Sequence, residues 1–77
     1  MKKVKIYTIK NCPQCQEAKK YFVSQSIDFE EIDLTDDKSA AQDLVQKTGF
    51  AAVPQIEIEN QIIVGWDQEK VKDLTSN

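Results

Sequence analysis

Short runs in which apolar and polar residues alternate predict β-strands in this chain. Residues 4–9 and 55–59 both alternate in this way, and the first run is rich in β-branched residues. A tight turn at residues 60–61 then returns the chain as a hairpin partner at 62–64. In residues 27–34 the apolar positions fall on both faces, so we expect an inner strand there rather than an edge strand.

Helical spacing of apolar residues predicts a first helix after the opening strand. Pro13 suits a first helical turn, and the helix runs to about Ser24. Cys15, Ala18 and Phe22 recur at the spacing of one helical face. We therefore expect these three side chains to point into the core.

Two further helices are predicted in the second half of the chain. The capping residues 35–37 start one of them, and Gly49 is a plausible C′ residue at its end. The residues expected on its apolar face are Ala41, Leu44, Val45 and Thr48. Residues 50–54 form a loop, and a short final helix starts at Asp67 with Val71 and Leu74 turned inward.

The resulting order is β-α-β-α-β-β-α, which is an α/β architecture. The first strand-helix-strand unit requires a parallel pair with a right-handed crossover, and the hairpin adds two antiparallel strands. We expect a single domain over residues 1–77, built as a four-stranded mixed sheet flanked by three helices on its two faces.

The composition excludes several classes of protein. Forty per cent of the residues are apolar and 30% are charged, which fits an ordinary globular domain. No apolar run approaches the roughly 18–20 residues that cross a bilayer, and lysines interrupt the stretch where a secretory signal would be apolar. We therefore expect a cytoplasmic protein that does not bind membranes.

Charge is distributed unevenly along the chain. Residues 1–20 hold six lysines and one acid (+5), whereas residues 21–77 hold four lysines and twelve acids (−8). A charge distribution of this kind is common in ordinary solvated surface. The positive segment, which contains the two cysteines, would also favour a thiolate and attract acidic partners. Nucleic acid is not an expected partner, because the chain has no arginine and no basic stripe interleaved with aromatic residues.

Cys12 and Cys15, the only cysteines, lie at the predicted junction of strand and helix. The free amide groups and the dipole of a helix N-terminus stabilise a thiolate at Cys12, while Cys15 lies one turn deeper on the same face. Dithiol exchange needs this asymmetry: Cys12 attacks a disulfide and Cys15 resolves the mixed disulfide. Lys10 either lowers the thiol pKa further or, as a flexible surface lysine, has no effect.

Other chemistry for the cysteine pair needs more ligands than one chain has. The sequence contains no histidine and no third cysteine, so a structural zinc site within one chain is not expected. Two chains could share a metal ion or an iron–sulfur cluster through four cysteines, which would make the protein a non-enzymatic dimeric carrier. We expect instead a monomer without metal.

Four segments together resemble the glutaredoxin family of the thioredoxin fold. They are Tyr7-Thr8, Cys12-Pro13-Gln14-Cys15, Ala52-Val53-Pro54 and Val64-Gly65-Trp66-Asp67. The resemblance spans nearly the whole chain and is closest to short bacterial glutaredoxin-like proteins. It implies a thiol-disulfide oxidoreductase without a bound cofactor, which reduces protein or glutathione mixed disulfides and is recharged by glutathione or a flavoprotein disulfide reductase.

The resemblance also implies a binding surface beside the cysteines. Val53-Pro54 would be the family's cis-proline segment, in which the Val53 backbone pairs with an extended substrate. Gly65 and Asp67 would contact the two ends of glutathione; the residues alone indicate a close backbone approach at Gly65 and a helix N-cap at Asp67. Trp66 either packs beneath the last helix or contacts substrate. The remaining candidate binding residues are Lys10, Pro13 and Gln14.

The chain departs from many glutathione-using members at five positions. Gln14 replaces a tyrosine, Ala52 a threonine, and Val64 the first of two glycines. Gln68 replaces a second acid, and Lys10 lies two rather than three residues before the first cysteine. Gln14 is shared with the glutaredoxin-like hydrogen donors of ribonucleotide reductase, although their Trp-Ser-Gly-Phe-Arg-Pro segment is missing. A donor to that enzyme, recharged by thioredoxin reductase, is therefore an alternative.

Overall fold

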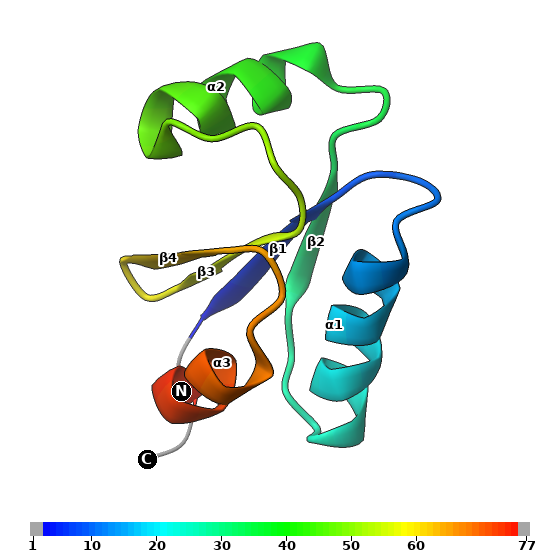
Figure 1. The fold of residues 1–77 in the computed structure, drawn as a ribbon, viewed down its shortest axis with the longest axis vertical. Helices are drawn as coiled ribbons and strands as arrows, with labels where there is room; N and C mark the ends of the chain where they lie inside the picture. Colours follow the sequence, from blue (N-terminus) through cyan, green and yellow to red (C-terminus); the bar gives the residue numbers. More distant parts are fainter. Residues whose placement is uncertain (1–2, 76–77) are drawn as a thin grey trace.

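All seven predicted elements are present in the computed structural model, which describes residues 3–75 (Figure 1). The strands are β1 (Val4–Thr8), β2 (Glu30–Asp33), β3 (Gln55–Ile58) and β4 (Gln61–Val64). The helices are α1 (Pro13–Ser24), α2 (Lys38–Thr48) and α3 (Gln68–Thr75). The predicted order of elements and the α/β class are confirmed.

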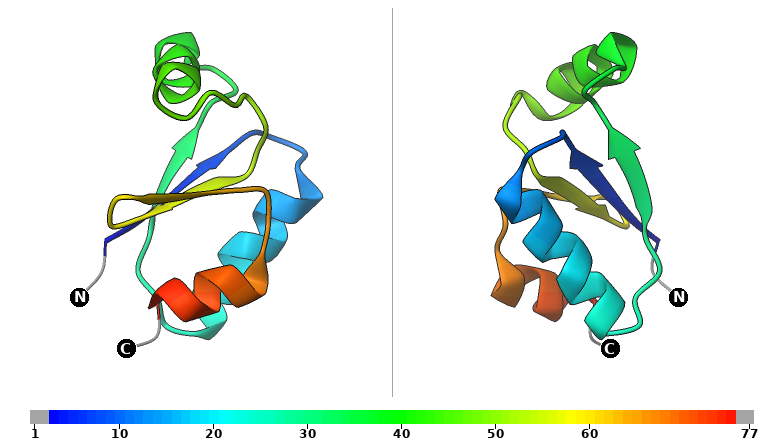
Figure 2. Two further views of the ribbon diagram at one scale, coloured as in Figure 1. Left: turned by 60° about the vertical axis from the view of Figure 1, so that its left-hand side comes forward. Right: turned by 90° about the vertical axis from the view of Figure 1, so that its right-hand side faces the viewer.

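The strands form one mixed sheet in the order β2-β1-β3-β4. β1 pairs in parallel with β2, and the β1–β3 and β3–β4 pairs are antiparallel. Helices α1 and α3 lie on one face of the sheet and α2 lies across the other (Figure 2). Since Tyr7 lies opposite Gln55, the segment after β1 and the segment before β3 leave the sheet at the same end.

The core fills the space between the sheet and helices α1 and α3. Its buried members are Val4, Ile6, Ala18, Phe22, Ile56, Ile58, Ile63 and Val71. The inward face predicted for α1 is confirmed, because Cys15, Ala18 and Phe22 are all buried. Leu74 of α3 is partly buried against the same cluster, as predicted.

The inner position predicted for the second strand is wrong, because β2 is an edge strand. The strand is shorter than residues 27–34, and three of its four residues are charged and exposed. Ile27 and Phe29, which suggested a strand covered on both faces, precede β2 and pack against the core from the connection after α1. Charged side chains such as these protect an open edge from pairing with other chains.

Helix α2 has the predicted ends but a smaller buried face than predicted. The Asp37 carboxylate accepts a hydrogen bond from the Ala40 N–H at 2.9 Å, and Gly49 ends the helix in the left-handed conformation. Only Leu44 is fully buried, and Val45, which was expected to face inward, is 41% exposed. Seven of the eleven residues of α2 are exposed, so the helix turns most of its surface to solvent.

The hairpin turn lies one residue earlier than predicted. Ile58 pairs with Gln61, so Glu59 and Asn60 form the turn and β4 begins at Gln61. Glu59 takes the left-handed conformation that such a turn requires (φ 57°). Among residues 3–75, no helix has both the length and the apolar character needed to span a bilayer.

Candidate active site at the start of helix α1

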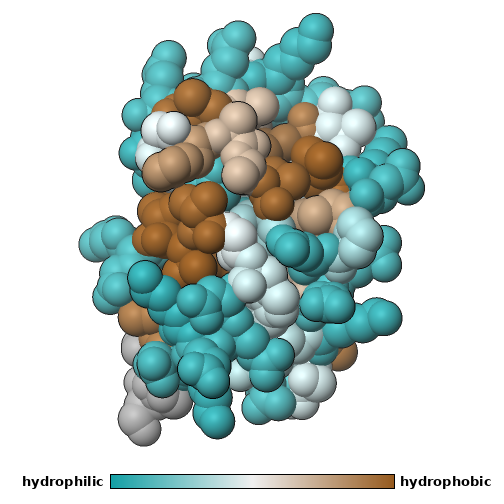
Figure 3. Space-filling view, viewed as in Figure 1, coloured by the Kyte–Doolittle hydropathy of each residue, from teal (hydrophilic) through white to brown (hydrophobic). Residues whose placement is uncertain are grey.

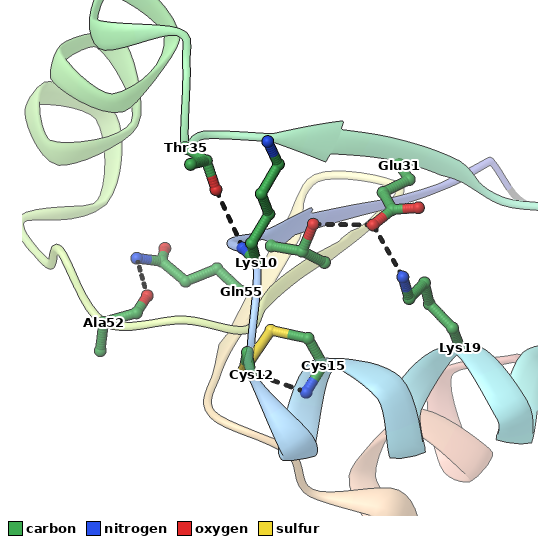
Figure 4. The surroundings of a disulfide bond; sticks show 9 residues. Lys10, Cys12, Cys15, Lys19, Glu31, Thr35, Ala52 and Gln55 are labelled. Carbon is green, nitrogen blue, oxygen red and sulfur yellow. Dashed lines mark hydrogen bonds and ion pairs between the residues drawn. A yellow bond between two sulfur atoms is a disulfide. The ribbon is translucent and has the colours of Figure 1, made fainter.

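Cys12 and Cys15 form a disulfide at the N-terminus of α1 (Figure 4). Their Cα atoms are 5.2 Å apart, within the range of ordinary disulfides. Cys12 is the N-cap of the helix, and its sulfur accepts a hydrogen bond from the Cys15 N–H at 3.2 Å. Cys12 is half-buried whereas Cys15 is only 1% exposed, which matches the asymmetry predicted from the spacing.

The chain reaches this cap through a short, tethered loop after β1. Asn11 turns the backbone in the left-handed conformation (φ 60°), and Pro13 occupies the first turn of the helix. The Lys10 N–H donates to Thr35 Oγ1 at 2.9 Å, which ties the loop to the segment after β2. The loop is therefore tied to the segment after β2 at Lys10 and continues directly into the helix that Cys12 caps.

The side chain of Lys10 does not contact that sulfur. Its ammonium forms an ion pair with Asp36 at 3.3 Å, and Figure 4 shows the side chain directed away from the disulfide. Both partners are largely exposed, so the ion pair contributes little to stability. Pro13 and Gln14 are exposed in the first turn, where they flank the more accessible cysteine.

The loop of residues 50–54 lies at the same end of the sheet as the cysteines. The Val53–Pro54 peptide bond is cis, as the resemblance implied. Pro54 is buried, Val53 is half-buried and Ala52 is exposed. The Pro54 carbonyl accepts a hydrogen bond from the Gly65 N–H at 2.8 Å, so the segment that contains Gly65 is fastened directly to the cis-proline segment.

The segment after β4 meets two of its three predictions. Gly65 takes a left-handed conformation (φ 87°), and a side chain there would meet no atom within 4 Å, so the predicted close backbone approach is wrong and the φ angle explains the glycine. Asp67 caps α3 by accepting from the Lys70 N–H at 3.1 Å, as predicted. Trp66 packs edge-to-face on Tyr21 and Phe22 of α1, so it has a packing role, and its contact with substrate stays a prediction.

A polar network beside the cysteines was missed in the sequence. Thr8, which is 1% exposed, donates its hydroxyl proton to Glu31 Oε2 at 2.8 Å, and Lys19 Nζ lies 3.0 Å from the same oxygen (Figure 4). The Lys19 ammonium holds the pKa of Glu31 below its ordinary value, and the Thr8 hydroxyl adds to this effect. The network joins β1, β2 and α1. No sequence motif signals it, because it depends on the parallel register of β1 and β2.

A second missed residue is Gln55. Its carboxamide nitrogen donates to the carbonyl oxygens of Phe50 and Ala52, at 2.8 and 2.9 Å. In the alternating run 55–59 this glutamine looks like a solvated position, yet it is 0% exposed. Its place directly after Pro54 is the only sequence signal that could have singled it out.

Exposed apolar side chains gather near this end of the molecule. Figure 3 shows them over the region of α2, the loop that follows α2, and β4. Phe50 is 56% exposed, and Val45 and Val64 are each 41% exposed. The loop that follows α2 thus presents apolar surface as well as backbone groups.

The family model for glutaredoxin matches residues 4–63, which contain both cysteines and the cis-proline segment. The chain belongs to the glutaredoxin family. Members of this family are generally thiol-disulfide oxidoreductases, and the arrangement of the Cys12–Cys15 pair fits that chemistry.

Similar proteins agree with this membership. The chain is 32% identical to a glutaredoxin-like 8.6 kDa protein of the rubredoxin operon of Clostridium pasteurianum, over 92% of this chain and 95% of that one. It is 34% identical to glutaredoxin 3 of Escherichia coli, over 87% and 81% of the two chains. Among solved structures it is similar to the glutaredoxin-like protein NrdH-redoxin of E. coli, with a TM-score of 0.86, 25% identity and 97% of both chains covered.

Side chains that could bind a metal do not gather at one place in the part of the chain that the structure describes. Within residues 3–75, no cluster of three or more cysteine, aspartate or glutamate side chains has the geometry of a metal site. A metal ion or cluster shared between two chains through four cysteines is the alternative that the sequence leaves open, and the monomer without metal stays a prediction.

Proposed function

We propose that this glutaredoxin-family protein reduces protein disulfides and glutathione mixed disulfides by dithiol exchange through Cys12 and Cys15. The observation that carries the proposal is the cap geometry of α1. A sulfur that accepts an amide hydrogen bond at a helix N-terminus is favoured as a thiolate, and Cys12 is the more accessible of the two cysteines.

The reaction proceeds in two exchanges. The Cys12 thiolate attacks one sulfur of the substrate disulfide, forms a mixed disulfide with it, and displaces the other sulfur as a thiolate that takes up a proton. Cys15 then loses its proton and attacks the Cys12 sulfur, which releases the second substrate thiol. The substrate has gained two electrons and two protons, and the protein is left with the Cys12–Cys15 disulfide.

Val53, Gly65 and Asp67 are the residues we assign to binding. The hydrogen bond between the Gly65 N–H and the Pro54 carbonyl keeps the two binding segments side by side. The open space beside Gly65 leaves room for a peptide or for glutathione. The Asp67 carboxylate, which caps α3, is exposed and can accept a further hydrogen bond from a ligand amine.

Single cysteine variants test the proposal. Cys12→Ser should abolish all turnover, because no nucleophile remains. Cys15→Ser should accumulate mixed disulfides with protein substrates, detectable by mass spectrometry, and should keep the activity that removes glutathione from a mixed disulfide. An active Cys12→Ser protein together with an inactive Cys15→Ser protein would mean that the two roles are reversed.

A second candidate is a hydrogen donor to ribonucleotide reductase that thioredoxin reductase recharges. Gln14, Ala52 and Val64 favour it, since each replaces a residue of glutathione-using members. The likeness to NrdH-redoxin, a protein described as having a thioredoxin-like activity profile, also favours it. The two candidates separate when the oxidised protein is offered glutathione with its reductase, or thioredoxin reductase with NADPH. Recharge by glutathione supports the first candidate, and recharge only by the flavoenzyme supports the second.

A further inference from the structure

Gln55 is a buried amide whose position makes it more than a core residue. It opens β3 directly after Pro54, and it is held in the sheet between Tyr7 of β1 and Val64 of β4. Its side chain is 0% exposed. The carboxamide is therefore anchored on an inner strand, at the end of the sheet where the loop of residues 50–54 enters it.

Both hydrogen-bonding protons of this carboxamide are used on the loop. Nε2 donates to the carbonyl oxygens of Phe50 and Ala52, so one nitrogen spans two peptide units of the segment before Val53. Figure 4 shows the bond to Ala52. Since both acceptors are carbonyls, only the nitrogen can face them. Within residues 3–75, no bond between two backbone groups joins residues 50–53 to another element, and the only further tether of the loop backbone is at Phe50, whose N–H donates to Thr48 Oγ1 of α2 at 3.2 Å and whose carbonyl accepts from it at 3.3 Å. The two hydrogen bonds from the Gln55 carboxamide therefore hold the loop backbone against the start of β3.

The oxygen of the carboxamide indicates that a contribution to stability alone does not explain why residue 55 is a glutamine. Oε1 is buried and has no hydrogen-bond donor within reach among the described residues. A buried acceptor without a donor is unfavourable, and an apolar side chain of the same size would avoid that cost. A glutamine here is explained by the two donors that it supplies to the loop.

We propose that Gln55 is a positioning residue, which sets the backbone of residues 50–53 so that Val53 can pair with an extended peptide substrate beside Cys12. The inference rests on the proposed function. It predicts a selective defect: without the two donors, peptide substrates bind less well, whereas the chemistry at Cys12 is unchanged. Gln55 itself touches neither the substrate nor the sulfur atoms in this scheme.

The test compares two substrates that differ in whether they carry a peptide backbone. One is a decapeptide with a glutathione mixed disulfide on a central cysteine, and the other is bis(2-hydroxyethyl) disulfide. Gln55→Met keeps the size of the side chain without its donors, and Gln55→Glu places oxygen against the two carbonyls. Gln61→Glu, on the exposed start of β4, is the matched control for the added charge.

For Gln55→Met we expect kcat/KM on the peptide to fall about tenfold through KM, as the loss of two hydrogen bonds predicts, with turnover of the small disulfide within about twofold of wild type. The rate at which iodoacetamide alkylates Cys12 should not change. Gln55→Glu should show the same pattern more strongly if it folds, and Gln61→Glu should show none of it.

Two results would overturn the inference. Equal losses on both substrates, parallel to a loss of thermal stability, would make Gln55 a structural residue only, and unchanged kinetics in Gln55→Met would remove any role. A wild-type protein that is inactive on both substrates would instead overturn the proposed function, and the inference with it. The three outcomes are distinguishable because the wild type is measured on both substrates.

Discussion

The two faces of the sheet are built from different contacts. Beneath α1 and α3 the contacts are apolar, and Phe22 is the largest member of a cluster of eight buried hydrophobic residues. Beneath α2 only Leu44 is fully buried from the helix, and Lys47 reaches the Glu57 carboxylate at 2.8 Å. Because the free energy of burial scales with apolar area, most of the stability should come from the first face.

The two halves of the candidate site fall on opposite sides of this division. Cys15 is part of the well-packed helix α1, so the cysteine pair rests on the stable face. The loop of residues 50–54 connects α2 to β3 and depends on polar contacts, chiefly those of Gln55. In the proposed function, a nucleophile on a well-packed helix therefore lies beside a binding loop of lower local stability, the kind of segment from which ligand-binding loops are commonly drawn.

The largest effect is expected from the well-packed face. Phe22→Ala should lower the free energy of unfolding by about 3–5 kcal/mol, because it removes a fully buried ring from the core. A chain of this size has a total of roughly 4–12 kcal/mol, so the variant should unfold at much lower urea concentration. Val23→Ala, a neighbour that is 69% exposed, should change the free energy by less than about 0.5 kcal/mol. A cost below about 1 kcal/mol for Phe22→Ala would contradict the comparison of the faces.

A smaller effect is expected when the same kind of cavity is made under α2. Leu44→Ala should cost about 2 kcal/mol, the low end for a buried leucine, since Leu44 lies outside the core cluster and its surroundings can collapse. Hydrogen exchange of the Gly49 amide, which bonds to the Val45 carbonyl, should speed up while amides of α1 stay protected. The partly exposed Val45 gives the control, Val45→Ala. Equal destabilisation by Leu44→Ala and Phe22→Ala would mean that the faces do not differ.

This division also explains which features the sequence could predict. The inward face of α1 and the position of the two cysteines at the start of this helix could be predicted from local spacing. The cis Val53–Pro54 bond could be predicted from the family resemblance. The edge position of β2 could not be predicted, because Ile27 and Phe29 serve the core from a connecting segment. Gln55 was missed for a similar reason. Its burial depends on a loop that folds back over it, and the alternation of apolar and polar residues in 55–59 does not depend on that loop.

A pH experiment sharpens the comparison on the α1 side. Because the Lys19 ammonium lowers the folded-state pKa of Glu31, this carboxylate stabilises the protein above its unfolded pKa near 4.5, and the contribution is lost as the pH falls through the folded value. Glu31→Gln should therefore be less stable than wild type at pH 7, by less than about 1 kcal/mol for this partly exposed pair. The difference should shrink in urea unfolding as the pH falls through the folded-state pKa of Glu31, as linkage requires. A difference that persists in acid would assign the effect to something other than the ion pair.

The smallest effect is expected on the α2 side, at the opposite end of the pH scale. The hydrogen bond to Glu57 raises the pKa of Lys47 above 10.5, and burial, followed by the Glu57 charge, raises the pKa of Tyr7 above 10.0. A group whose pKa is raised in the folded state stabilises the protein below its unfolded-state pKa. This stabilisation is lost as the pH rises through the folded-state pKa. Lys47→Met should therefore cost roughly 0.2–1 kcal/mol at neutral pH, and this cost should fade in alkali above the folded pKa.

Oxidised protein is the form to use for this measurement, because disulfide-bonded cysteines do not titrate in alkali. Tyr7→Phe should make the loss of stability above pH 10 less steep, since the phenol no longer gives up a proton on unfolding. Lys38→Met removes a lysine from the other end of α2, outside the ion pair with Glu57, and is the control for the loss of one positive charge. If Lys47→Met and Lys38→Met behaved alike, the ion pair would not hold α2 to the sheet, and the polar contacts that distinguish this face would be those of Gln55 alone.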